Sequence, residues 1–209
     1  MITLGIECSS RQGSVALLRA GEVIAEKIWI ADRIRHNVIF DELENLLNTA
    51  GVTYTDISQF AVGRGPGSFS GMRMSFAVAQ ALALPDKKEV RAVSSGAALA
   101  FQVAKENGAQ KIAVAGDARR GQIWFGEFNA GQVAAEWKLI PYEEVEISSD
   151  VLVVSPEAER LEKIFPSIGA PRFPLAADVA LLAQTSTEPL EPLYMHPPVF
   201  VEPKFLKTE

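Results

Sequence analysis

The order of the first secondary-structure elements is the feature that most constrains how this chain can fold. Three strand-like segments come first, at residues 2–8, 13–18 and 22–30, and only short, turn-rich stretches separate them. Connections this short join consecutive antiparallel strands, so we expect a three-stranded meander. An apolar pattern at i, i+4, i+7, i+8 and i+11 then predicts an amphipathic helix over residues 38–50.

A short strand at residues 60–63, a glycine-rich loop and a helix over residues 70–84 follow, and Pro85 ends that helix. The first part of the chain therefore has the order β-β-β-α-β-α. This order is the plan of one half of an RNase H-like protein of the ASKHA (actin and sugar-kinase) type. We predict an α/β chain with this fold.

The second half repeats the signal in weaker form. We expect a first lobe over residues 1–100 and a smaller, divergent second lobe over residues 101–209. The segment from Pro189 onward holds five of the twelve prolines, so it should run extended over the surface. The elements expected beyond Pro85 are strands at 89–93, 111–115, 122–128 and 151–154, with a hairpin turn at 117–121, and helices at 95–107, 157–165 and 175–184.

Composition excludes several classes of protein. A formal net charge of −6 argues against holding RNA through a broad positive surface of this chain's own, because phosphate contact needs clustered Lys and Arg. With Cys8 as the single cysteine, neither an intrachain disulfide nor a cysteine zinc cage can form, and His36 and His196 are a poor supply of metal ligands. We see no signal peptide and no apolar run of the roughly 20 residues that cross a bilayer. A cytoplasmic protein without a metal site or membrane span is expected.

The loop between the 60–63 strand and the following helix is rich in glycine and serine. Its glycines open backbone conformations that other residues avoid, Pro66 stiffens its middle, and Ser68 and Ser70 are both good helix N-caps. The Gly-Lys-Ser/Thr ending of a Walker A loop is absent. Two interpretations remain open: a tight turn without a ligand, or an anion or partner site that uses Arg64 or Arg73. The loop consists of Gly63, Arg64, Gly65, Pro66, Gly67, Ser68, Phe69, Ser70, Gly71, Met72 and Arg73.

This string closely resembles the GRGPGSFTGLR signature of the TsaB/YeaZ family, with Ser70 in place of Thr and Met72 in place of Leu. Other stretches agree in order and spacing. Residues 4–10 are similar to the family's first strand, Arg35-His36 to its Arg-His-Ser, and residues 117–122 to its Asp-Ala-Arg turn. The resemblance covers about residues 2–130, and residues 203–207 match the family's closing motif only loosely.

The resemblance implies a non-catalytic subunit of the machinery that makes threonylcarbamoyladenosine on tRNA. Such a chain binds TsaD, acts together with the TsaE ATPase, and contacts tRNA only through its partners. It has no catalytic residue and no cofactor of its own, and ATP and metal belong to the partner subunits. The His-x-x-x-His metal pair of TsaD is absent here, since Phe40 stands four residues after His36.

An alternative is an independent ATP-binding phosphotransferase of the same superfold. Glu7, at the end of the first strand, and Asp117 are the candidates for a vestigial nucleotide site, because a first-strand carboxylate in this superfold often holds metal-bound phosphate. A peptidase has little support, because Ser68 and Ser70 lack a His–Asp pair placed for serine catalysis.

The helix over residues 70–84 is apolar nearly all round. It either lies between the sheet and a neighbouring helix in one core, or presents one face to a partner. In the resembled family the first two helices pair with TsaD or with a second copy of the chain. Carried over, this predicts an interface of Ile39, Phe40, Leu43, Leu47, Met72, Phe76 and Gln80.

Overall fold

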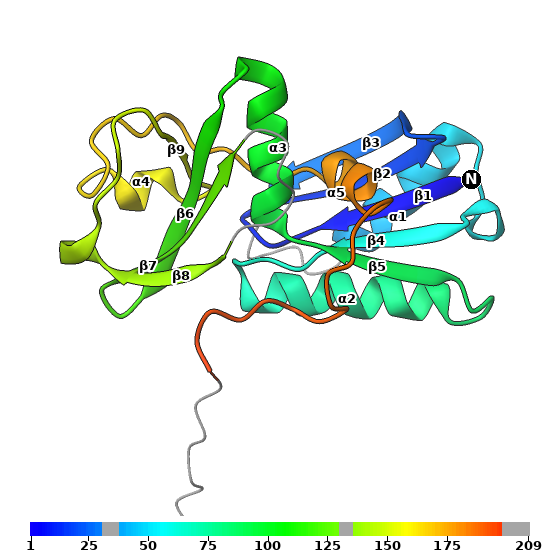
Figure 1. Ribbon diagram of the computed structural model, residues 1–209. Coiled ribbons are helices and arrows are strands. Elements are labelled where there is room, and N and C mark those ends of the chain that lie inside the picture. Colours follow the sequence, from blue (N-terminus) through cyan, green and yellow to red (C-terminus); the bar gives the residue numbers. More distant parts are fainter. Residues whose placement is uncertain (31–37, 130–135, 198–209) are drawn as a thin grey trace, which may run out of the picture.

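The computed structural model describes residues 1–30, 38–129 and 136–197, and places them in two sheets with helices on and between them (Figure 1). The first sheet has five strands in the order β3-β2-β1-β4-β5. β2 pairs antiparallel with β1 and β3, while β4 pairs parallel with β1 and β5, so the expected meander is confirmed. The strands are β1 (Ile2–Glu7), β2 (Gln12–Arg19), β3 (Glu22–Ile30), β4 (Gln59–Gly63) and β5 (Glu89–Val93).

Helices cover both faces of this sheet. α1 (Val38–Ala50) and α2 (Phe69–Ala83) share one core with the strands, in which Leu43, Phe60 and Phe76 are buried. α5 (Ala176–Leu182) packs on the opposite face, where Ala176 and Ala180 approach the strands closely. A methyl group on Gly5 would overlap the Ala176 carbonyl, so this glycine admits the helix.

The second sheet has the order β8-β7-β6-β9 and follows the plan of the first, with three antiparallel strands and a parallel fourth. The helix α3 (Ser95–Asn107) lies between the two sheets (Figure 1) and contributes to the core on each side of it. The remaining elements are β6 (Lys111–Arg119), β7 (Gln122–Asn129), β8 (Lys138–Pro141), β9 (Leu152–Val154), α4 (Ala158–Leu161) and the short 3-10 helices at Tyr54–Asp56 and Tyr142–Glu144.

Three expectations for the second half are wrong. β6 runs on to Arg119, so Asp117 lies in a strand and only Arg120 and Gly121 form the turn. α4 is four residues long, much shorter than the expected helix over residues 157–165. α5 returns to the first sheet, so the second lobe does not contain everything after residue 101. The segment after Pro189 has no regular structure up to Pro197, as expected from its prolines.

No helix in the described ranges is both long enough and apolar enough to span a bilayer.

Candidate functional site

The glycine-rich loop joins β4 to α2 and folds back against the end of β1. The Ser68 hydroxyl accepts a hydrogen bond from the Gly71 N–H at 3.2 Å and so caps α2, while the Ser68 N–H donates to the Ser9 carbonyl at 2.6 Å. Gly65 has a φ of 97°, which L side chains rarely adopt. A methyl group on Gly71 would overlap the Cys8 carbonyl. The loop therefore needs its glycines for close backbone contact.

We expect Gly71→Ala to lower the stability of the chain by about 1–3 kcal/mol, because the backbone at Cys8, directly after β1, would have to move away from the new methyl group. Urea denaturation measures this loss. Gly169→Ala is the matched control, because nothing lies within 4 Å of the position its methyl group would take. Equal stability of the two variants would contradict the close packing of the loop on β1.

Glu7 lies at the end of β1 and is completely buried. Its carboxylate accepts a hydrogen bond from the Ser9 N–H at 2.5 Å and another from the Ser95 hydroxyl at 2.6 Å. The Ser95 hydroxyl in turn accepts from the Gly65 N–H at 2.9 Å. Glu7 thus joins β1, the glycine-rich loop and the start of α3. Burial raises the pKa of Glu7, and the hydrogen bonds from Ser9 and Ser95 offset part of that rise.

The raised pKa of Glu7 predicts a pH-dependent stability. Between the ordinary pKa of Glu7 and its raised folded pKa, the folded chain keeps a proton that the unfolded chain has released. Stability therefore falls as pH rises through that window, by about 1.4 kcal/mol for each pH unit that separates the two pKa values. Glu7→Gln removes this titration, so the variant should gain stability relative to the original chain as pH rises above the ordinary pKa of a glutamate. Urea denaturation of both chains at a series of pH values measures the difference, and parallel stability curves would show that the pKa of Glu7 is not raised.

A cleft of about 1180 Å³ lies between the lobes, and the glycine-rich loop forms one of its walls. Asp117 lies on the opposite wall, where its oxygens accept hydrogen bonds from Arg119 at 2.6 Å, Tyr142 at 3.0 Å and Arg160 at 3.1 Å. Glu7 does not line the cleft. The structure therefore does not bring together Glu7 and Asp117, the two candidate residues for a nucleotide site. Glu7 is buried and hydrogen-bonded to Ser9 and Ser95, and Asp117 is paired with arginines.

Two further side chains of the described residues are candidates for catalysis: His196, which lines the cleft, and Cys8, which does not. His196 contacts the Ala118 carbonyl through Nε2 at 2.8 Å, and burial raises the pKa of the Cys8 thiol to about 12. A thiol with that pKa is almost entirely protonated at neutral pH and is a poor nucleophile. Among the described residues no cluster of three or more His, Cys, Asp or Glu could hold a metal ion. His36 lies outside the described residues.

The two arginines of the loop have different surroundings. Arg64 is buried, and its guanidinium contacts the Glu188 carboxylate at 3.2 Å and the Glu191 carbonyl at 2.9 Å. It is therefore not available for an anion in the cleft. Arg73 is exposed and lies 5.2 Å from the centroid of the Phe69 ring. The contact between Arg64 and residues near the C-terminus could not be predicted from the sequence, because 124 residues separate Arg64 from Glu188.

The predicted partner interface needs correction. Five of its seven residues are at most 6% exposed. Four of these lie in the core that α1 and α2 share with the first sheet, and Met72 is buried beside Gly65 of the glycine-rich loop. The helical period was predicted correctly, but it marks the face that packs inward. Only Phe40 and Gln80 are exposed. The five buried residues are Ile39, Leu43, Leu47, Met72 and Phe76.

The outer face of α2 is a different set of residues. They fall at i, i+4, i+8, i+11, i+12 and i+15, which is one face of a helix; all are exposed, and most are apolar or small. Leu84, which caps the end of α2, is 75% exposed, and Phe69 at the start is 57% exposed. We call this set the outer α2 face: Phe69, Arg73, Ala77, Gln80, Ala81 and Leu84.

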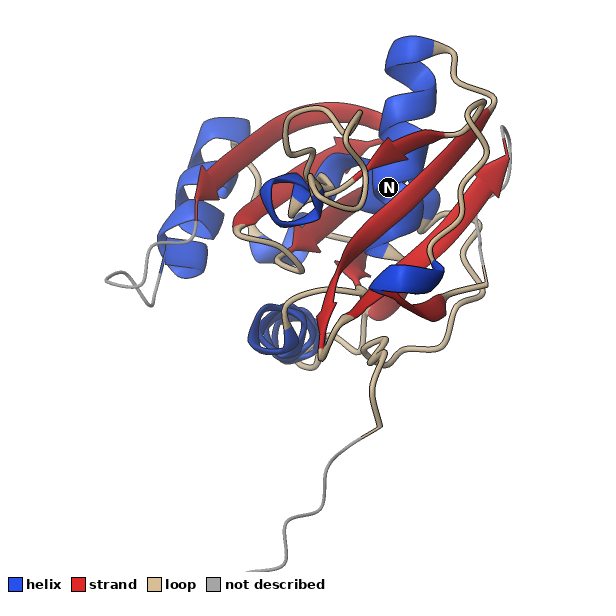
Figure 2. Cartoon of the chain, turned by 90° about the vertical axis from the view of Figure 1, so that its left-hand side faces the viewer, coloured by secondary structure: helices blue, strands red, loops and turns tan. Residues whose placement is uncertain are grey.

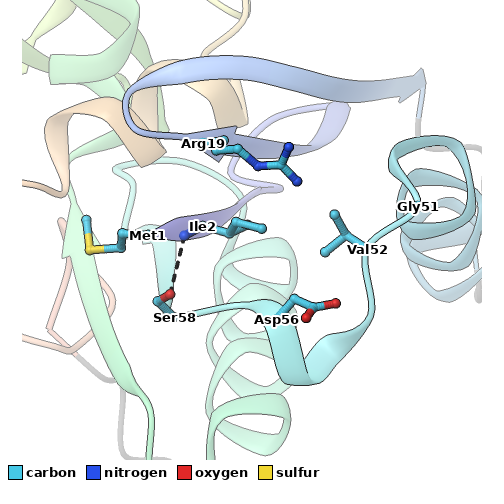
Figure 3. Close-up of a pocket in the computed structure, with 7 residues that line it drawn as sticks. All are labelled: Met1, Ile2, Arg19, Gly51, Val52, Asp56 and Ser58. Atoms are coloured by element: carbon cyan, nitrogen blue, oxygen red, sulfur yellow. Dashed lines mark hydrogen bonds between the residues drawn. The ribbon is translucent and has the colours of Figure 1, made fainter.

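A second hollow, of about 450 Å³, lies at the opposite end of β1 (Figure 3). Figure 3 shows Arg19 and Asp56 on its rim, and the Ile2 N–H donates to the Ser58 hydroxyl at 3.3 Å. Neither the glycine-rich loop nor the outer α2 face reaches it.

Two sheets of matching plan with helices on and between them define an RNase H-like protein of the ASKHA class. A solved activator of 2-hydroxyisocaproyl-CoA dehydratase from Clostridium difficile shares this fold, with a TM-score of 0.52 at 13% identity over 88% of this chain and 94% of that one. The family model described as "TsaD: tRNA N6-adenosine threonylcarbamoyltransferase" matches residues 30–168. The chain belongs to this family, and its named relatives are of the TsaB/YeaZ type.

Two relatives illustrate the similarity. The Escherichia coli tRNA threonylcarbamoyladenosine biosynthesis protein TsaB is 35% identical over 128 residues, which are 61% of this chain and 55% of that protein. The solved YeaZ from Pseudomonas aeruginosa superimposes with a TM-score of 0.77 at 27% identity, over 92% of this chain and 99% of that one. The chain thus spans about half the length of the curated relatives that it matches.

Proposed function

We propose that this chain is a non-catalytic subunit in the synthesis of threonylcarbamoyladenosine on tRNA, and that it acts by binding a TsaD-type transferase. The outer α2 face is the observation that carries this proposal. It is a row of exposed small and apolar side chains along one helix, which allows close helix-to-helix packing. The names of the relatives supply the pathway.

The side chains of the cleft favour a non-catalytic role of this chain over a catalytic one. Its candidate acid Asp117 is engaged by arginines, and Glu7 is enclosed away from it. ATP and metal then belong to the partners, TsaD and the TsaE ATPase, in the cytoplasm. The net charge of −6 supports contact with tRNA through those partners. An independent phosphotransferase is favoured by no observation, because its first-strand carboxylate is buried.

Co-purification tests this proposal. The chain should elute together with the TsaD of the same organism and restore tRNA modification to a reconstitution that contains TsaD and TsaE but lacks this chain. If the chain elutes separately and modification proceeds equally without it, the proposal is wrong. ATP hydrolysis by the isolated chain that is lost in Glu7→Ala would favour the phosphotransferase instead.

A further inference from the structure

Residues 186–197, which we call the C-terminal segment, contact the first lobe through a series of hydrogen bonds and one ion pair. The Ser186 hydroxyl donates to the Ala92 carbonyl at 2.6 Å, and the Ser94 N–H donates to the Glu188 carboxylate at 2.9 Å. Glu188 also pairs with Arg64, whose carbonyl accepts from the Leu193 N–H at 2.7 Å. Figure 1 shows the segment running past the first turns of α2, and in Figure 2 it leaves the molecule next to a helix seen end-on. Because Leu193 is bound to Arg64, Arg64 also fixes the position of Tyr194, the residue that follows Leu193.

Tyr194 is held against the start of the outer α2 face. Its ring centroid is 5.0 Å from that of Phe69, with a tilt of 34° between the rings. Arg73 lies over Phe69 on the next turn of the helix. Although the rings contact each other, Phe69 remains 57% and Tyr194 43% exposed. Two partly exposed aromatic rings and an exposed guanidinium thus extend the outer α2 face onto the C-terminal segment, where all three side chains also line the cleft between the lobes.

We propose that Phe69, Arg73 and Tyr194 anchor the partner, so that the docking surface includes the C-terminal segment as well as α2. The proposal rests on the proposed function and adds a specific contact to it. Aromatic and arginine side chains carry a large share of binding energy at protein interfaces, above all where they are already held in place. Within the described ranges Arg73 makes no ion pair, so covering it requires a carboxylate from the partner. The matching surface is apolar with an acidic residue.

Arg64 acts in this arrangement as a positioning residue. Arg64 is not one of the residues proposed to contact the partner. Its ion pair with Glu188 and its hydrogen bond with Leu193 hold the backbone that leads to Tyr194. Glu188→Gln keeps the shape of this link and removes its charge. We expect it to weaken partner binding less than Tyr194→Ala does, and to increase hydrogen exchange in residues 188–194.

Calorimetric titration of the full chain with its TsaD-type partner tests the anchor. Tyr194→Ala and Phe69→Ala should each weaken binding about 10-fold or more. Arg73→Gln should reduce the salt dependence of the dissociation constant, and Arg73→Glu should weaken binding further than Arg73→Gln. Tyr54→Ala and Arg120→Gln change exposed residues of the same types outside the anchor, and should bind as the original chain does.

The outcomes separate this inference from the function it rests on. If the original chain does not bind the partner, the proposed function fails. If it binds, and a charge placed on Ala77 blocks binding while Tyr194→Ala and Phe69→Ala bind normally, the docking helix is correct and the anchor is wrong. Equal salt dependence of the original chain and Arg73→Gln would likewise overturn the carboxylate contact.

Discussion

Ala77→Glu is expected to abolish pairing with the TsaD-type partner while leaving the chain folded. Ala77 lies in the middle of the outer α2 face and is exposed, so a longer side chain has room in the free chain. Glutamate is also a good helix former. In a packed interface the same side chain would hold two helices apart and leave a carboxylate without water. We expect at least a 100-fold rise in the dissociation constant, which corresponds to about 2.7 kcal/mol.

Co-elution and calorimetric titration measure this effect, and circular dichroism checks that the variant is folded. Asn107→Glu is the matched control, because it adds the same charge to an exposed residue of α3, far from the outer α2 face in the sequence. Normal pairing by Ala77→Glu would place the docking surface elsewhere on the chain.

Phe76→Asp, one residue earlier in the same helix, is expected to unfold the chain. Phe76 is 6% exposed and packs in the core between α2 and the first sheet. Removal of a buried phenylalanine side chain costs about 3–5 kcal/mol, and an unpaired buried carboxylate adds several more. The sum is comparable with the total stability of a typical domain, about 5–15 kcal/mol. Any loss of partner binding in this variant would therefore follow from loss of the fold.

Thermal unfolding followed by circular dichroism measures this prediction. Phe76→Leu keeps an apolar side chain and should retain a cooperative transition at a moderately lower temperature. A folded Phe76→Asp with a normal transition would mean that Phe76 is not part of the core. The pair of neighbours therefore separates a core position from an interface position on the same helix.

Local sequence signals were sufficient for the elements from β1 to α2, but not for the return of α5 to the first sheet. Strand alternation, short turns and the Pro85 stop correctly predicted the order from β1 to α2. They were less successful in the second half. There the helix expected over residues 157–165 is only the four-residue α4, and the strand β6 continues through Asp117. A polar residue near a glycine predicts a turn locally, but pairing with β7 keeps it in the strand.

The signature loop from Gly63 to Arg73 could be recognised from the sequence, since its glycines and N-cap serines are local requirements of a tight strand-to-helix connection. The role of Arg64 in holding the C-terminal segment could not be recognised from the sequence. Its partner Glu188 lies far away in the chain, and only the return of α5 to the first sheet brings them together. The same return brings Tyr194 against Phe69.

The sequence by itself determined the family, the element order of the first lobe and the helical period of α1 and α2, because each of these depends on residues that are neighbours along the chain. The tertiary structure decided which face of those helices is open to a partner. A helix that is apolar nearly all round has no unique inner face until the sheet covers one side of it. That packing buries Met72 and Phe76 and leaves Ala77, Gln80 and Ala81 in contact with solvent.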